Sequence, residues 1–270
     1  MKTLTQGVIG VLKLLNHEEI LERVRAHHQL VEDLGFTVVM TSLVGSQNYG
    51  LADDTSDIDT YSFVLPSFEQ LATAEEPDTG VVEADDGLCN IKDIRLALNL
   101  LQKTSPNSIE YFTSKYQVYN PKFESVLKEY LEDKVVLYNM IHANTYHMLS
   151  AMAGMARQLV KRNMPAGKRC AHALRLQNML FYYFTSKDPY KVLDMRGDEQ
   201  IVLAMKRDTN TENDESYNKT CIEVAEEMEL FRDNLNLSKE SIDTEECGKM
   251  TIAFFQKRIL AKYLEELHGN

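Results

Sequence analysis

Two strand-like runs separated by a short polar segment constrain the fold of this chain more than any other feature. Residues 36–44 are apolar and β-branched, which favours a largely buried strand over a helix of the same length. Residues 56–65 form a second run, which Pro66 stops. The sequence therefore predicts two consecutive strands with a polar connection between them.

The connection begins with a predicted phosphate-binding point at Gly45 and Ser46. If a helix starts just after Gly45, Ser46 lies where backbone N–H groups have no intrahelical partner and where the helix dipole favours an anion. Gly45 lets a phosphate approach the backbone closely, and the Ser46 hydroxyl adds a donor. Gly50 can end the short helix in a conformation that a side chain would resist.

Asp57 and Asp59 open the second run. Because side chains alternate across a strand, both carboxylates are expected on one face, beside the phosphate-binding point. A divalent cation would remove their mutual repulsion, and oxygen-only ligation suits Mg²⁺, which also binds substrate phosphates. A Gly-Ser pair or an Asp-x-Asp pair alone is usually a turn or a solvated loop. Their combination between two strands predicts metal-assisted phosphoryl or nucleotidyl transfer.

Four motifs follow one another along the chain. They are Gly-Ser-x-x-Tyr-Gly at 45–50, Ser-Asp-x-Asp at 56–59, Ser-Pro-x-x-x-Glu at 105–110 and Lys-x-x-x-His-Ala-x-Arg-Leu at 168–176. In this order they resemble the RlaP family (also called YcgL-like), polymerase-β-like nucleotidyltransferases associated with RNA repair. Neither Gly-x-Gly-x-x-Gly nor the P-loop pattern occurs, so those modes of phosphate binding are excluded.

The resemblance implies an α+β fold, in which a palm made of a small mixed sheet with helices precedes an all-helical C-terminal domain. We expect the nucleotidyltransferase domain at residues 1–130 and a helical substrate-binding domain at 131–270. The first motif supplies the residues of the palm that we expect to bind the nucleotide, which are Gly45, Ser46, Tyr49 and Gly50.

The family also implies a third carboxylate on a neighbouring strand, which completes the metal cluster and helps to activate the attacking hydroxyl. Asp93 ends the second strand of a predicted hairpin, and the segment Asp-Ile-Arg-Leu at 93–96 resembles the one that carries this residue in polymerase β. The alternative role is that of a helix N-cap, for which Asp is favoured. Glu83 and Asp86 are the substitutes. The expected catalytic and metal-binding residues are thus Asp57, Asp59 and Asp93.

Lys168, His172 and Arg175 fall at i, i+4 and i+7, so a helix presents them as one polar stripe. Such a stripe opposite the carboxylates would bind a triphosphate, or an RNA phosphate beside the metal ions. The alternative is an internal bridge from His172 and Arg175 to acidic residues between the domains.

Residues 17–34 and residues 134–162 are among the other segments predicted to be helical. Residues 17–34 have apolar residues at helical spacing, and His27 and His28 within them are expected at the surface, because adjacent histidines on a helix point in different directions. Residues 134–162 are expected to form one long helical stretch with a methionine-rich core face.

The net charge of −12 argues against broad non-specific nucleic-acid binding, but a local basic patch can coexist with an acidic total. No apolar run approaches the ~20 residues that span a bilayer, so no membrane partner is expected. The four cysteines are scattered without Cys-x-x-Cys spacing, which favours reduced thiols in a cytoplasmic protein.

The sequence is therefore interpreted as a nucleotidyltransferase that moves a nucleoside monophosphate from an NTP to an acceptor hydroxyl and releases pyrophosphate. Two Mg²⁺ ions are the expected cofactors, with Mn²⁺ as the alternative ion and ATP among the candidate substrates. The family resemblance points to RNA as the acceptor, with a tRNA 3′ end as one candidate. A protein or small-molecule acceptor, and a non-catalytic nucleotide or RNA sensor, are the alternatives; the oligomeric state is left open.

Overall fold

The sheet of this protein has five strands in the order β3-β4-β2-β1-β5. The computed structural model describes residues 15–53, 56–73, 75–76 and 79–268. Strands β2 and β4 run parallel, whereas the other neighbouring pairs are antiparallel. The strands are β1 Thr37–Val44, β2 Asp59–Leu65, β3 Thr79–Ala84, β4 Gly87–Asp93 and β5 Gln117–Tyr119. This is the small mixed sheet that the sequence predicted.

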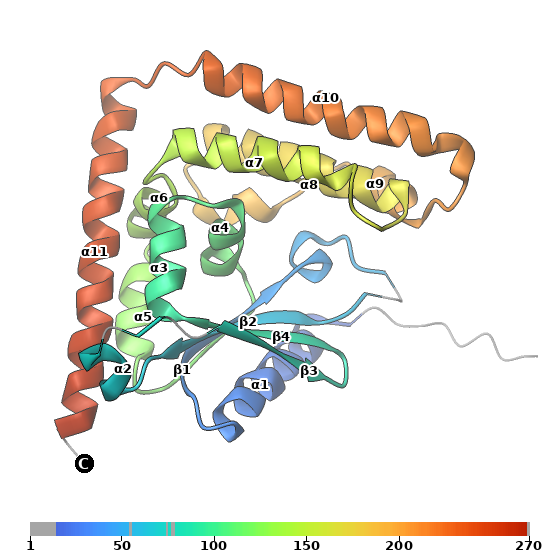
Figure 1. Ribbon diagram of the computed structural model, residues 1–270. Coiled ribbons are helices and arrows are strands. Elements are labelled where there is room, and N and C mark those ends of the chain that lie inside the picture. Colours follow the sequence, from blue (N-terminus) through green and yellow to red (C-terminus); the bar gives the residue numbers. More distant parts are fainter. Residues whose placement is uncertain (1–14, 54–55, 74, 77–78, 269–270) are drawn as a thin grey trace, which may run out of the picture.

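Helix α1 (His17–Asp33) covers one face of the sheet, as Figure 1 shows. Asn16 caps it in a reciprocal arrangement with Glu19. The expected surface placement of its two histidines is wrong, because both rings are buried against polar groups of the sheet. His27 bonds with Thr60 Oγ1 and with Asp86 Oδ1, each at 2.9 Å, and His28 bonds with Thr41 Oγ1 at 3.0 Å. The hydroxyls of the strands satisfy the rings and make their burial tolerable.

The opposite face of the sheet packs against the helical region. Its helices are α2 Phe68–Ala72, α3 Ile94–Gln102, α4 Pro106–Thr113, α5 Glu124–Leu131, α6 Lys134–Ile141, α7 Thr145–Leu159, α8 Ala166–Thr185, α9 Glu199–Arg207, α10 Asp214–Asp233 and α11 Lys239–His268. The stretch predicted as one helix over 134–162 is broken between α6 and α7. The Asn144 side chain accepts a hydrogen bond from the His147 N–H and so caps a new helix there.

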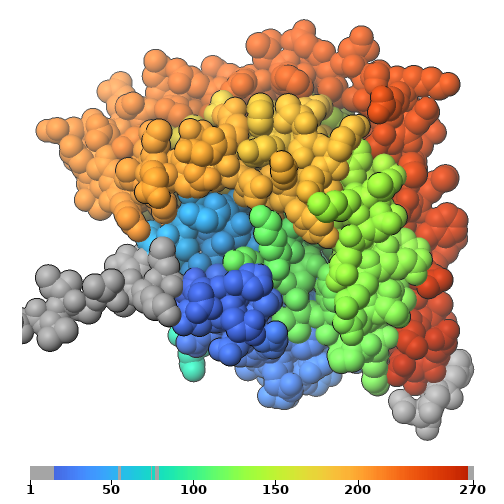
Figure 2. Space-filling model, turned by 180° about the vertical axis from the view of Figure 1, so that it is seen from behind, coloured from blue at the N-terminus to red at the C-terminus, as the bar shows by residue number. Residues whose placement is uncertain are grey.

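One continuous hydrophobic core runs from the sheet into the C-terminal helices. It includes Val39 and Phe63 of the sheet, Met152 of α7 and Tyr263 of α11. Helix α11 lies along α3, α5 and α6, and α10 lies alongside α7 and α8 (Figure 1). Seen from behind, the segment that follows β1 meets the surface formed by α8 and α9 (Figure 2). The division into domains at residue 130 stays a prediction.

None of the described helices is both long and apolar enough to span a bilayer. All four cysteines are free thiols, and Cys89, Cys170 and Cys221 are buried. The cytoplasmic location stays a prediction.

Candidate active site

The connection after β1 forms a tight turn at Gly45, a single 3₁₀ turn over Ser46–Tyr49, and a left-handed end at Gly50. Gly45 has φ +84° and ψ −158°, a conformation that is open only to glycine. The short helix predicted after Gly45 is therefore present, and Gly50 ends it with φ +67° as expected. This geometry turns the chain sharply at the end of β1 and leaves the backbone of Gly45 uncovered by a side chain.

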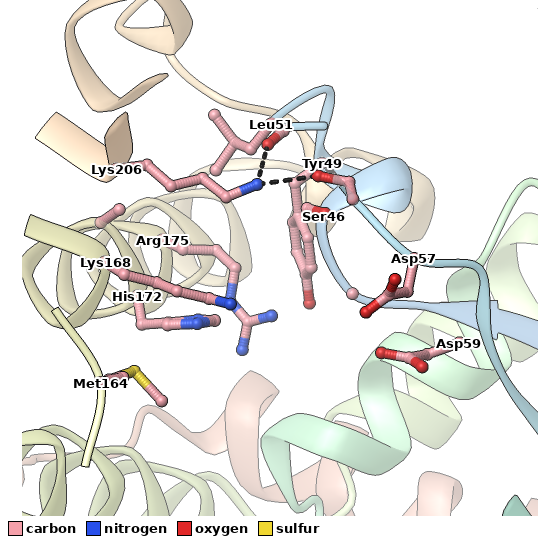
Figure 3. Close-up of a pocket in the computed structure, with 13 residues that line it drawn as sticks. Ser46, Tyr49, Leu51, Asp57, Asp59, Met164, Lys168, His172, Arg175 and Lys206 are labelled. Atoms are coloured by element: carbon pink, nitrogen blue, oxygen red, sulfur yellow. Dashed lines mark hydrogen bonds between the residues drawn. The ribbon is translucent and has the colours of Figure 1, made fainter. Parts of the chain in front are cut away.

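The carboxylate pair, Asp57 and Asp59, lies beside this turn (Figure 3). Strand β2 begins only at Asp59, which is paired with Val44, because the partner strand turns away at Gly45. Asp57 and Asp59 still alternate with the buried Ile58, so both reach the same side. Asp59 Oδ1 accepts a hydrogen bond from the Leu88 N–H at 3.1 Å, and a Cβ on Gly45 would lie 4.0 Å from Asp59 Oδ2.

The hairpin turn between β3 and β4 packs against the backbone of Ile58, which lies between the two carboxylates. The Ile58 N–H donates to the Asp86 carbonyl at 2.9 Å. A Cβ on Gly87 would lie 2.2 Å from the Ile58 carbonyl oxygen, a distance that no real side chain tolerates. Glycine at 87 therefore lets the hairpin pack directly against the backbone between the two carboxylates.

Helix α8 brings Lys168, His172 and Arg175 to the opposite side of the same cavity (Figure 3). We call these three residues the α8 stripe. The cavity has a volume of about 250 Å³. It is lined by Gly45, Ser46, Tyr49, Leu51, Ser56, Asp57, Asp59, Met164, Lys168, Ala171, His172, Arg175 and Lys206. The structure thus brings together the sequence-predicted site residues except Gly50, which ends the turn outside the lining, and Asp93.

Arg175 is held by two neighbours. Its guanidinium lies 4.4 Å from the centre of the Tyr49 ring, and its Nη1 lies 3.7 Å from Glu110 Oε2. Burial raises the pKa of the Tyr49 hydroxyl well above its ordinary value, so the ring stays neutral beneath the guanidinium. The predicted internal bridge to an acidic residue therefore exists at Arg175, which also lines the cavity.

His172 is the second member of the α8 stripe that faces the cavity. Burial lowers the pKa of its imidazole to about 3, and the cations Arg175, Lys168, Arg162 and Lys206 lower it further in the same direction. The ring is therefore neutral at physiological pH when only protein surrounds it.

Glu110 lies between the two sides of the cavity, although the sequence patterns assigned it no role beyond membership of the motif at 105–110. It is 4% exposed, and its Oε1 accepts the Gly45 N–H at 2.6 Å. The backbone donor that was expected to meet a phosphate is therefore bonded to Glu110. The only sequence feature that could have marked Glu110 as a site residue is its membership of the motif at 105–110.

Lys206 is a site residue that the sequence patterns did not single out. It comes from α9, and its Nζ donates to the Leu51 carbonyl at 2.9 Å and to Ser56 Oγ at 3.0 Å (Figure 3). The same Nζ pairs with Asp53 Oδ2 at 3.1 Å. Lys206 thus holds both ends of the connection that leads to Asp57, and no spacing rule links residues so far apart in the chain.

The structure does not bring Asp93 to the cavity, which corrects the expectation of a third carboxylate there. In the parallel pairing of β2 with β4, Asp93 lies opposite Val64, five residues along β2 from Asp59 and therefore roughly 16 Å away. Asp93 is fully buried, accepts the Arg95 N–H at 2.7 Å as the N-cap of α3, and pairs with the Arg95 guanidinium. The N-cap alternative is the one observed.

The proposed substitutes for Asp93 also lie outside the cavity lining. Glu83 is exposed on β3, and Asp86 bonds with His27. Within residues 15–53, 56–73, 75–76 and 79–268, no three His, Cys, Asp or Glu side chains gather as a metal-binding group. The described site therefore offers a pair of carboxylates.

The comparison with protein families is consistent with this arrangement. A family model described as RlaP, RNA repair pathway DNA polymerase beta family, matches residues 16–182. The matched region extends from α1 to the second half of α8 and so includes both sides of the cavity. No curated protein matches the chain.

Proposed function

Since this chain belongs to the RlaP family, the RNA repair pathway DNA polymerase beta family, we propose that it transfers a nucleoside monophosphate from an NTP to an acceptor hydroxyl. Pyrophosphate is the second product. The observation that carries the proposal is the cavity in which the carboxylate pair faces the α8 stripe. Transfer from a polyphosphate requires cations along the phosphates and a metal site at the reacting phosphorus. The α8 stripe would supply the cations, and the carboxylate pair would supply the metal site.

Asp57 and Asp59 fit a divalent cation. In the described part of the chain, neither carboxylate forms an ion pair with a lysine or arginine, so the negative charge of the pair is uncompensated. Carboxylate oxygens with open positions for substrate phosphates suit Mg²⁺, with Mn²⁺ as the alternative. When bound, the metal supplies charge neutralisation at the reacting phosphate and an oriented acceptor oxygen.

The protein side chains bind the rest of the nucleotide. Lys168 and Arg175 attract the β- and γ-phosphates, and the Ser46 hydroxyl adds a donor beside them. The Gly45 N–H is engaged by Glu110, so the contribution of Gly45 is the open space above its backbone. Tyr49 acts through Arg175, which it holds in position.

RNA is the proposed acceptor, with a tRNA 3′ end as the first candidate. The family description is the main support. A second support is the charge near the cavity, where Arg162 on the α7–α8 connection and Lys168 lie close to His172 and form no ion pair with any described residue. Cations that the protein does not neutralise are suited to bind a phosphate backbone, even on a chain with a net charge of −12.

The test supplies each α-labelled NTP with total RNA or with total protein and follows the label. We expect label in RNA with one or more of the nucleotides, and no transfer above background by a variant that carries both Asp57→Ala and Asp59→Ala. Asp85→Asn is the matched control, because Asp85 is an exposed acid on the hairpin turn outside the cavity. Transfer by the double variant at the wild-type rate would exclude this site. Label found in protein and not in RNA would show that the acceptor is a protein.

A non-catalytic nucleotide or RNA sensor is the second candidate, and one observation favours it. The described carboxylate pair has no third carboxylate beside it, whereas the family pattern expects one. Tight binding of an NTP to the wild-type protein without release of pyrophosphate, with every acceptor supplied, would support the sensor.

A further inference from the structure

His172 differs from its neighbours in the α8 stripe. Its ring projects into the cavity beside Arg175 (Figure 3), and across the described residues neither ring nitrogen has a hydrogen-bond partner. Arg175, by contrast, is held by Glu110 and Tyr49. An imidazole that lines a cavity without a protein partner is available to a ligand.

The electrostatic surroundings make this ring responsive to an anion. Burial and four nearby cations disfavour its protonated form, so it carries no charge in the absence of ligand. A bound polyphosphate would bring several negative charges against the same ring and would reverse the balance in favour of the imidazolium. His172 would then take up a proton only when the polyphosphate is present.

We propose that His172 is a catalytic residue that donates a proton to the departing pyrophosphate; this inference rests on the proposed function. The acceptor oxygen forms a bond to the α-phosphorus, and the bond from that phosphorus to the α,β-bridging oxygen breaks. The electron pair stays on the bridging oxygen, which takes the proton from a ring nitrogen of His172. The proton of the acceptor hydroxyl leaves to solvent, and solvent reprotonates His172.

Simple binding explains this residue less well than proton donation. Lys168 and Arg175 already supply permanent positive charge on the same side of the cavity. A ring that is neutral before the ligand arrives adds little long-range attraction for it. Once protonated beside the polyphosphate, the His172 ring can donate its proton as the leaving group develops negative charge. This is the requirement for a general acid.

The test varies the basicity of the leaving group. The NTP that gives the most label with total tRNA is compared with its α-labelled β,γ-methylene and β,γ-difluoromethylene analogues, whose leaving groups are more and less basic, respectively. We expect His172→Gln to slow transfer from the normal NTP by about 10²-fold, with little change in KM. The loss should be largest with the methylene analogue and smallest with the difluoromethylene analogue. His17→Gln, an exposed histidine on α1, is the matched control and should match wild type with all three.

An equal loss with all three nucleotides, or no loss, would overturn the general-acid role while leaving the proposed function intact. No transfer by the wild-type protein with any NTP would overturn the proposed function and this inference with it. The pH profile of wild-type kcat provides a measurement that does not depend on a variant. The decrease in kcat at high pH should be large with the methylene analogue and small with the difluoromethylene analogue. Identical profiles would contradict proton donation.

Discussion

The Gly45 N–H donates a hydrogen bond to Glu110 Oε1 across 2.6 Å, so the turn at the end of β1 is bonded to helix α4. The other carboxylate oxygen of Glu110 faces the guanidinium of Arg175 on α8, 3.7 Å away. One buried carboxylate therefore connects the turn after β1 with the cationic side of the cavity. This connection aligns the two sides before any ligand is bound.

Replacement of Glu110 should therefore destabilise the fold. Glu110→Ala leaves the Gly45 N–H without its acceptor and the buried Arg175 without its ion-pair partner, and we expect a loss of about 3 kcal/mol in the free energy of unfolding. Glu110→Gln keeps an acceptor for Gly45 and should cost less. Urea unfolding measures both. Glu129→Ala is the control, because Glu129 forms an exposed pair with Arg258 that should contribute less than about 1 kcal/mol. An equal cost for Glu110→Ala and Glu129→Ala would contradict the connection.

Asp93 should contribute to stability and not to the chemical step. Asp93→Asn can still cap α3, but it removes the charged pairing of Asp93 with Arg95, and we expect a loss of about 3 kcal/mol in unfolding free energy. Nucleotide transfer per folded molecule should equal that of wild type, whereas Asp59→Asn should abolish it. Denaturant unfolding and labelled transfer on the same preparations separate the two effects. Loss of transfer by folded Asp93→Asn protein would restore the metal-binding role that the sequence suggested.

Lys206 should position the segment that leads to Asp57. Lys206→Met keeps much of the side-chain length but removes the bonds to the Leu51 carbonyl and to Ser56, and it leaves Asp53 without this cation. We expect slower nucleotide transfer and a stability loss of about 2 kcal/mol. Lys219→Met is the control, since Lys219 forms an exposed i,i+4 pair with Glu223 away from the cavity. Wild-type transfer by Lys206→Met would show that the segment holds its position without this contact.

The stability of the protein should fall with decreasing pH through His172. The pKa of this imidazole is about 3 in the folded protein, against an ordinary value of 6.5. Between these values the unfolded chain binds the proton and the folded protein does not, so stability is full above about pH 6.5 and decreases as the pH falls toward 3. Urea unfolding measures the free energy of unfolding of wild type and of His172→Gln across this range. As the pH falls, the stability of wild type should decrease relative to that of the variant. Parallel curves would contradict the lowered pKa.

Much of the palm could be predicted from contiguous residues. The strand at β1, the turn after Gly45 and the position of Asp57 and Asp59 beside it follow from side-chain alternation and glycine conformation, which act within a few residues. The α8 stripe follows from helical spacing alone, and the structure adds only what it faces. The break at Asn144 was missed because its cap competes locally with a helix that composition favours throughout.

Relations between distant segments required the tertiary structure. His27 and His28 are buried because hydroxyls of the sheet happen to meet their rings, which no helical pattern reveals. Asp93 lies away from the carboxylate pair because of the register between β2 and β4, and a carboxylate at the end of a strand looks the same in sequence whichever residue it pairs with.

The sequence by itself determined the chemical groups at the site: a glycine turn, two alternating carboxylates and three polar residues on one helical face. Only the tertiary structure decided that these groups share one cavity, that Glu110 connects its two sides and that Lys206 holds the segment before Asp57. The physical reason is range. Backbone geometry and helical period act between near neighbours in the chain, whereas strand register and helix packing bring together residues that no local pattern relates.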